Sequence, residues 1–276
     1  MTTTQPDARP IVINCNDAVT AEEIGHVLLV TISRPEARNA VNQDVIRGVG
    51  RALEHAEECT GIRAVVITGA GDKAFCAGAD LKAAAAGGFD EVAEEMEKWG
   101  FAGYVKHAIS KPTIAAVNGF ALGGGTEIVL ASDLAVASSE AAFGLPEVQR
   151  GIFAGAGGAF RLGRQVPKKI AMEILLTGQP LPAQRALEIG MVNRVVPQDQ
   201  VLETAMELAN QICRNAPLAV QTSKRIANAI TDGHVQGEDE DWARSEAEGQ
   251  ALMRSKDAME GMLAFAQKRD PNWQGQ

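Results

Sequence analysis

The feature that most constrains the fold is an alternation between short apolar runs that end at glycine or proline and segments with helical periodicity. HVLLVTISRP (26–35) and RAVVITGAG (63–71) have the length of strands, and the segment 42–58 between them repeats apolar residues at helical spacing. The same design recurs in PTIAAVNGFALGGG (112–125) and DLAVASSEAAFG (133–144). This alternation predicts an α/β fold, in which ligands bind at the edge where the strands meet their loops.

The second part of the chain is predicted to be helical. From about residue 160 onward, apolar residues recur every three or four positions, which indicates helices that pack against the same chain or against another subunit. We therefore expect a flexible N-terminal segment (1–20), an α/β core (21–200) and a helical C-terminal region (201–276).

Composition excludes several classes of function. The chain has 276 residues, 46% of them hydrophobic, and a formal net charge of −9, which argues against broad binding to nucleic acid or to anionic membranes. No apolar run is long enough for a membrane helix, and the start MTTTQPDARP does not resemble a secretory signal, so a cytoplasmic location is expected. The four cysteines show no disulfide or zinc pattern, so we expect reduced thiols and no metal: Cys15, Cys59, Cys76 and Cys213.

Three common functional motifs receive little or no support. GAGDKA (69–74) fits part of a dinucleotide-binding fingerprint, but no clear helix follows it at once and no acidic residue ends the next strand. The chain contains no phosphate-binding P-loop motif and no G-x-S-x-G elbow, so a hydrolase triad has no support either.

Three glycine-rich loops, each beside a strand end, are the strongest candidates for a site. They are AFCAGADLK (74–82), NGFALGGGTE (118–127) and FGLPEVQRGIFAGAGG (143–158), and the last two carry Glu127 and Glu147. Glycine lets a ligand approach the main chain and lets successive amides point at one oxygen, as an oxyanion hole requires. Two carboxylates facing the same pocket would serve as a general acid and a general base.

Each glutamate also has a simpler interpretation. Glu127 is in the first turn of a predicted helix, where the helix dipole favours an acidic residue without any catalytic role. Glu147 follows Pro146 and is also compatible with a solvated turn. Both interpretations stay open on the residues alone.

Together these motifs resemble the crotonase superfamily of enoyl-CoA hydratases and isomerases, from about Ile24 to the C-terminus. AFCAGADLK resembles a loop that binds CoA and supplies one oxyanion-hole amide, and AAVNGFALGGGTEI resembles the second oxyanion loop with the first catalytic glutamate. FGLPEVQRGIFAGAGGAFRL resembles the segment with the second glutamate, and GMLAFAQKRDPNWQG resembles members related to carnitinyl-CoA dehydratase. The resemblance implies a spiral of repeated ββα units with a helical C-terminal trimerisation region.

The resemblance also assigns roles to individual residues. It implies that the amides of Ala79 and Gly124 form the oxyanion hole, and that Glu127 and Glu147 act on a water held between them. The residues that it places in contact with CoA are Arg38, Ala77, Asp80, Leu81, Lys82, Phe265 and Lys268. Phe265 and Lys268 would reach the CoA from an adjacent subunit, which makes a homotrimer or a dimer of trimers the expected assembly.

The function implied is reversible hydration of a 2-enoyl-CoA thioester, with CoA as the substrate handle and no metal or redox cofactor. An enoyl-CoA isomerase and a specialised dehydratase of the carnitinyl-CoA type are the alternatives within the family. The loop residues Phe153, Ala154, Ala159 and Phe160 depart from the pattern of short-chain hydratases, which indicates a different acyl pocket. A non-enzymatic or RNA-binding relative, a hydrolase and a dehalogenase fit the acidic, two-glutamate chain less well.

Overall fold

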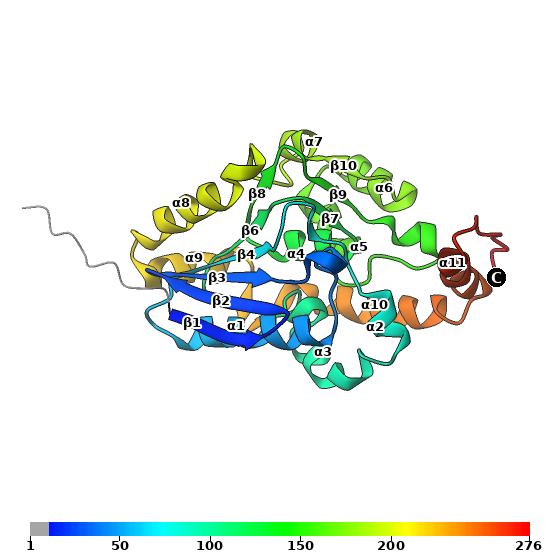
Figure 1. Cartoon of the computed structure of the whole chain (residues 1–276), viewed down its shortest axis with the longest axis horizontal. Coiled ribbons are helices and arrows are strands. Elements are labelled where there is room, and N and C mark those ends of the chain that lie inside the picture. Colours follow the sequence, from blue (N-terminus) through cyan, green and yellow to red (C-terminus); the bar gives the residue numbers. More distant parts are fainter. Residues whose placement is uncertain (1–10) are drawn as a thin grey trace, which may run out of the picture.

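A seven-stranded sheet forms the centre of the molecule. In the computed structural model, which describes residues 11–276, the strand order is β1-β2-β3-β4-β6-β8-β11. The first three strands pair antiparallel, and β3, β4, β6, β8 and β11 run parallel (Figure 1). The strands are β1 (Ile11–Asn16), β2 (Val19–Ile24), β3 (Val27–Ile32), β4 (Ala64–Gly69), β6 (Thr113–Val117), β8 (Leu134–Ser138) and β11 (Arg194–Val196).

The segment 1–20 was expected to be flexible, but part of it forms a strand. Residues 11–16 are strand β1, which pairs with β2, so this portion belongs to the sheet. Residues 1–10 lie outside the described residues.

A second, smaller sheet has the order β10-β9-β7-β5, and β5, β7 and part of β9 lie in the three glycine-rich loops. Its strands are β5 (Ala74–Cys76), β7 (Phe120–Leu122), β9 (Ala142–Gly144) and β10 (Leu181–Pro182). β5, β7 and β9 run parallel and follow β4, β6 and β8 along the chain. The chain therefore repeats a strand–turn–strand–helix unit, which confirms the α/β class and the ββα repeat.

Helices cover both faces of the large sheet. α1 (Gln43–Glu58) matches the helix predicted over 42–58, and the side chain of Asn42 caps it by accepting the amide of Val45 at 3.1 Å. α1 packs on the side chains of one face of β3, including Leu28, whereas α8 (Val201–Cys213) covers Val27 on the opposite face. Alternate residues of a strand thus enter two cores.

From residue 160 onward the chain is mainly helical, as predicted, but β10, β11 and a short hairpin of β12 (Ile230–Thr231) and β13 (His234–Val235) also lie in this part. Figure 1 shows α11 at one end of the molecule, beyond α10. None of the helices among residues 11–276 has the length and apolarity needed to cross a membrane. The remaining helices are α2 (Leu81–Ala85), α3 (Ala93–Trp99), α4 (Gly124–Ala131), α5 (Gly158–Gln165), α6 (Lys168–Thr177), α7 (Ala183–Glu188), α9 (Pro217–Ala227), α10 (Asp239–Leu252) and α11 (Lys256–Gln267).

Candidate active site

Glu127 is a buried carboxyl in the first turn of α4. Its side chain is turned inward, only 3% of the residue is exposed, and Oε1 accepts the amide of Gly158 at 2.9 Å. Burial, reinforced by the charge of Glu147, raises the pKa of Glu127 to about 8, although the amides of Gly158 and Ala156 act to lower it. The helix dipole stabilises an exposed acidic residue in the first turn, so it does not by itself explain why the carboxyl of Glu127 is buried.

Glu147 faces the start of the same helix. It lies in the short helical turn η4 (Pro146–Arg150), and a methyl group placed on Gly123 would be 3.0 Å from its Oε1. Its Oε2 is buried and has no hydrogen-bond partner among the described residues, and burial raises the pKa of Glu147 to about 7. The simple solvated-turn interpretation therefore does not describe Glu147, and the two carboxyls share one electrostatic environment.

The amides of Ala79 and Gly124 belong to two loops that touch. A β-carbon on Gly78, whose φ is +91°, would be 3.3 Å from the nitrogen of Gly124. Val41 pairs with this loop by donating to the carbonyl of Gly78 and accepting from the amide of Asp80, both at 2.8 Å. Neither Ala79 nor Gly124 donates its amide to an acceptor within residues 11–276, so both amides are available to one external oxygen.

Two further contacts of α4 require glycine. A β-carbon on Gly125 would overlap the carbonyl oxygen of Cys76 on β5, and one on Gly124 would overlap the ring of Phe101. Because Gly125 lacks a side chain, α4 can approach β5 closely enough to bring its N-terminus to the Ala79 loop, and because Gly124 lacks one, the ring of Phe101 fits against that N-terminus. Phe101 was not identified from the sequence, because it belongs to no motif.

Arg38 and Ala77 are brought together by the main chain. The amide of Ala77 donates to the carbonyl of Arg38 at 3.1 Å, and the Arg38 side chain is exposed. Arg38 and Asn39 both have left-handed backbones, and the buried Asn39 amide group donates to the carbonyls of Ala70 and Ala74 at 2.9 and 2.8 Å. This anchor holds the exposed arginine beside the AFCAGADLK loop.

The carboxylate of Asp80 is already engaged within the chain. It caps α2 by accepting the amides of Lys82 and Ala83, and it pairs with Arg34 at 2.9 Å. Burial acts to raise the pKa of Asp80, but the bonds from Arg34 and the α2 amides outweigh it and lower the pKa. Leu81, 50% exposed, and Lys82 are open to a ligand, whereas Asp80 orders the loop. The role of Arg34 was missed, since its partner is distant in sequence.

Phe265 and Lys268 lie at the end of α11, beside the Glu147 segment of their own chain. The guanidinium of Arg150 stacks over the Phe265 ring at 4.4 Å, and Lys268 caps the helix with a left-handed backbone. A β-carbon on Gly261 would overlap the carbonyl of Arg150, so α11 packs tightly on η4. Both side chains are exposed and available to a neighbouring molecule.

Potential metal ligands gather at a different place. Among residues 11–276, only Glu23, His55 and Cys59 bring three such atoms within 4.8 Å of one another, and His55 Nε2 already pairs with Glu23 at 2.8 Å. Cys59, Cys76 and Cys213 are free thiols, and the side chain of Cys15 lies outside the described part.

Comparison with known proteins gives one consistent result. Residues 22–276 match the family described as enoyl-CoA hydratase/isomerase. Carnitinyl-CoA dehydratase of Proteus mirabilis is 40% identical over 264 residues, covering 91% of this chain and 96% of the relative, and the Salmonella typhimurium protein of that name is 41% identical over 254 residues, with the same coverage.

Solved structures agree with these relatives. The structure of carnitinyl-CoA hydratase from Mycobacterium avium has 55% sequence identity and a TM-score of 0.92, and the match covers 95% of this chain and all of that one. Enoyl-CoA hydratase from Mycobacterium tuberculosis has 42% identity and a TM-score of 0.73 over the same coverage.

Proposed function

This chain belongs to the enoyl-CoA hydratase/isomerase family, and we propose that it is a hydro-lyase that reversibly adds water across the 2,3 double bond of a 2-enoyl-CoA thioester. The observation that carries the proposal is the pair Glu127 and Glu147. The pKa of each carboxyl is raised, Glu127 is in the first turn of the helix that presents the amide of Gly124, and the carboxyl of Glu147 faces the start of that helix. One carboxyl ionised and one protonated is the state that water addition needs.

The amides of Ala79 and Gly124 would hold the thioester oxygen. As water adds at C3, electrons move through the double bond to this oxygen, and the negative charge of the enolate develops there. Donors that are fixed before the reaction stabilise that charge without reorganising, and loss of one such donor typically raises the barrier by about 3 to 4 kcal/mol.

The two glutamates would move the protons. The ionised carboxylate takes a proton from the water as its oxygen bonds to C3, and the protonated carboxyl gives its proton to C2 as the enolate collapses. The two carboxyls exchange protonation states, and dehydration runs the same steps in reverse. Glu127 and Glu147 share one proton near neutral pH, so their pKa values describe the pair.

CoA would bind across the exposed loop of Arg38, Ala77, Leu81 and Lys82, with Asp80 ordering that loop. The positive charges of Arg38 and Lys82 suit the phosphates of CoA in a chain that is acidic overall. We propose further that Phe265 and Lys268 complete the site from an adjacent subunit of a homotrimer or dimer of trimers. The proposed reaction needs no redox or metal cofactor, and the cytoplasmic location stays a prediction.

A specialised dehydratase is the second candidate, because the curated relatives at 40% and 41% identity are named carnitinyl-CoA dehydratase. Both candidates use the same two glutamates and the same oxyanion hole. They differ only in the acyl group that the pocket accepts.

The test is the loss of the conjugated enoyl-thioester absorbance when purified protein is mixed with crotonyl-CoA, longer 2-enoyl-CoAs and dehydrated carnitinyl-CoA. We expect wild type to consume at least one thioester, and Glu147→Gln to be slower by at least about a hundredfold. The matched control is Glu140→Gln, since Glu140 is an exposed glutamate of the preceding turn. Near-normal turnover by Glu147→Gln would overturn the two-glutamate mechanism, and no consumption of any thioester would overturn the hydratase assignment.

A further inference from the structure

A cavity of about 380 Å³ opens beside the candidate reaction centre. Its lining includes Phe101, whose ring packs against Gly124, and Ala156, whose amide hydrogen-bonds to Glu127. The cavity therefore begins next to the oxyanion hole and the catalytic carboxyl. An acyl group attached to a thioester held by these amides would extend into it.

Aromatic and aliphatic side chains make up much of the cavity wall. The larger apolar residues are Met96, Phe101, Val105, Phe153 and Trp242. The polar side chains are Lys106, Ser245 and Glu246. Phe153 is one of the residues at which the loop departs from the pattern of short-chain hydratases, so this part of the wall differs from the one that pattern implies.

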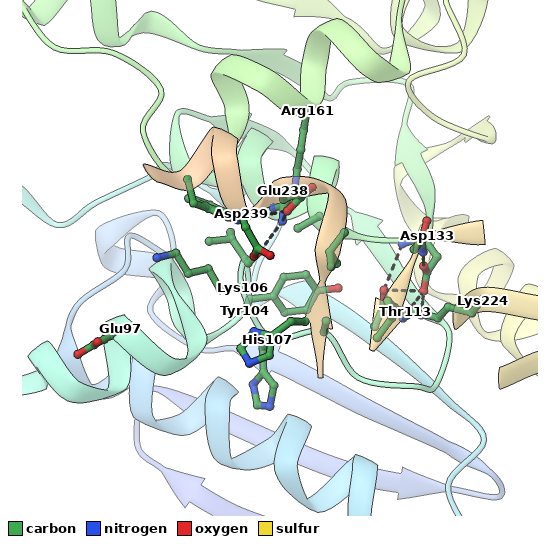
Figure 2. A pocket seen from close by; sticks show the side chains of 18 residues that line it. Glu97, Tyr104, Lys106, His107, Thr113, Asp133, Arg161, Lys224, Glu238 and Asp239 are labelled. Carbon is green, nitrogen blue, oxygen red and sulfur yellow. Dashed lines mark hydrogen bonds and ion pairs between the residues drawn. The ribbon is translucent and has the colours of Figure 1, made fainter. Parts of the chain in front are cut away.

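A second cavity, of about 280 Å³, lies beyond this wall and is much more polar. Figure 2 shows Tyr104, His107, Asp133 and Lys224 around it. It contains neither catalytic glutamate. Val105, Lys106 and Trp242 line both cavities and therefore separate them.

Trp242 is fixed in this partition by several contacts. Its indole Nε1 donates to Glu238 at 3.3 Å, and its ring meets Phe160 edge-on with 5.0 Å between centroids. Glu238 in turn accepts Nε and Nη2 of the buried Arg161 at 2.8 and 2.6 Å (Figure 2), and Nη2 also donates to the carbonyl of Val105 at 2.7 Å. Because Arg161 is on the helix that begins at the Glu127-binding amide, the partition and the catalytic centre belong to one rigid unit.

Lys106 adds a positive charge to the partition. Its Nζ lies 4.8 Å from the centroid of the Trp242 ring, so the face of the aromatic ring already holds a cation. A ligand ending in a quaternary ammonium would have to displace this ammonium from the ring or be repelled by it, and the carboxylate of Glu246 on the same lining is solvent-exposed, so it offsets only part of this repulsion. A compact uncharged acyl group meets no such penalty.

We propose that Trp242 and Lys106 form the end wall of the acyl pocket and restrict this chain to compact acyl groups without a distal positive charge. The inference rests on the proposed function, because it takes the cavity as the site of the acyl part of a CoA thioester. It also separates the two candidates above, since the wall favours a plain enoyl group over a carnitinyl group.

The test measures binding rather than turnover, so that failure of the wall is distinct from failure of the hydratase assignment. Dissociation constants for saturated butyryl-CoA and dodecanoyl-CoA are measured by calorimetry with wild type, Trp242→Ala, Trp242→Phe and Lys106→Ala. The control is Trp273→Ala, which removes a tryptophan outside both cavities. Lys106 is exposed, so its substitution leaves the fold intact even if Trp242→Ala is unstable.

The quantity compared is the affinity for dodecanoyl-CoA divided by the affinity for butyryl-CoA. We expect this ratio to be at least about tenfold higher in Trp242→Ala and in Lys106→Ala than in wild type, because a few more methylene groups can then enter an apolar space. Trp242→Phe and Trp273→Ala should keep the wild-type ratio. The proposal that Trp242 and Lys106 end the pocket would be wrong if wild type and Lys106→Ala had the same ratio of dodecanoyl-CoA to butyryl-CoA affinity and wild type already bound dodecanoyl-CoA more tightly than butyryl-CoA. If the ratios shift as expected but no enoyl-CoA is hydrated, the wall stands and the hydratase assignment falls.

The charge is tested with two saturated acyl-CoAs of matched shape, one ending in trimethylammonium and one in tert-butyl. Wild type should bind the uncharged ligand at least about tenfold more tightly, and Lys106→Glu should reverse most of that difference. A wild type that prefers the trimethylammonium ligand would overturn the inference and favour the carnitinyl-type dehydratase.

Discussion

At the scale of the residue, the proposed hydration depends on how one proton is shared between the carboxyls of Glu127 and Glu147. The pKa of Glu127 is raised to about 8 and that of Glu147 to about 7, in both cases mainly by burial. The reactive singly protonated pair is most populated between these values, so we expect kcat/KM for hydration to be bell-shaped in pH with limbs near them. A pH profile that stays flat through this range would contradict the shared-proton mechanism.

The same burial predicts a pH-dependent stability. Between its ordinary pKa of 4.5 and about 8, native Glu127 keeps a proton that the unfolded chain has released, so the free energy of unfolding falls as pH rises through this window. The glutamine of Glu127→Gln cannot ionise. We therefore expect the free energy of unfolding to decrease less with rising pH in this variant than in wild type, by at least about 1 kcal/mol. Urea unfolding near pH 5 and near pH 9, each fitted for wild type and variant, checks this. Parallel pH dependences would refute it.

Local sequence patterns were sufficient to propose some site residues but not others. Glu127 and Glu147 could be proposed because each lies in a glycine-rich loop motif, and the structure brings their carboxyls near one another, where burial raises both pKa values. Arg34 and Trp242 could not be found in this way, because their roles depend on partners in other segments, Asp80 and Glu238, that only the folded chain brings near. The roles assigned to the CoA-contacting residues stay predictions.

At the scale of the element, the helix over 42–58 was predictable because its apolar spacing and its cap are local signals. The small sheet was not, since β5, β7 and β9 have only three residues each and lie inside glycine-rich loops. Their pairing depends on contacts between distant loops rather than on alternation along one strand.

The contact between α4 and β5 gives a prediction at this scale. In Gly125→Ala, the new methyl group overlaps the main-chain oxygen of Cys76, so α4 must shift and carry the Gly124 amide away from Ala79. We expect a loss of at least about 2 kcal/mol in the free energy of unfolding and a lower kcat. The measurements are urea unfolding and the crotonyl-CoA assay.

The matched control is Gly163→Ala on α5, where a β-carbon meets no atom within 4 Å. Because alanine suits a helix better than glycine, this variant should be more stable by about 0.5 to 1 kcal/mol, with unchanged activity. Equal stabilities of the two variants would show that the close approach of α4 to β5 is not required.

At the scale of the whole molecule, the C-terminal helices present apolar side chains that the single chain leaves uncovered. Leu218 and Ile226 on α9 are 74% and 77% exposed, and Leu176 on α6 is 68% exposed. Leu218 and Ile226 lie eight residues apart, on one face of α9, and exposed apolar side chains gathered on one face are a feature of surfaces that meet another protein. This pair is consistent with the proposed homotrimer or dimer of trimers, in which Phe265 and Lys268 would reach a neighbouring CoA site.

The last prediction joins assembly to ligand binding. Sedimentation should give three or six times the 29.1 kDa of one chain, and the double variant Leu218→Glu and Ile226→Glu should dissociate, because charges cannot be buried unpaired at an apolar contact. Gln211→Glu, at an exposed polar position of α8, is the control and should leave the assembly intact. If the neighbour supplies Phe265 and Lys268, the dissociated variant must also bind CoA at least about tenfold more weakly, the scale of losing one charged contact. A monomer that keeps full CoA affinity would show that each chain completes its own site.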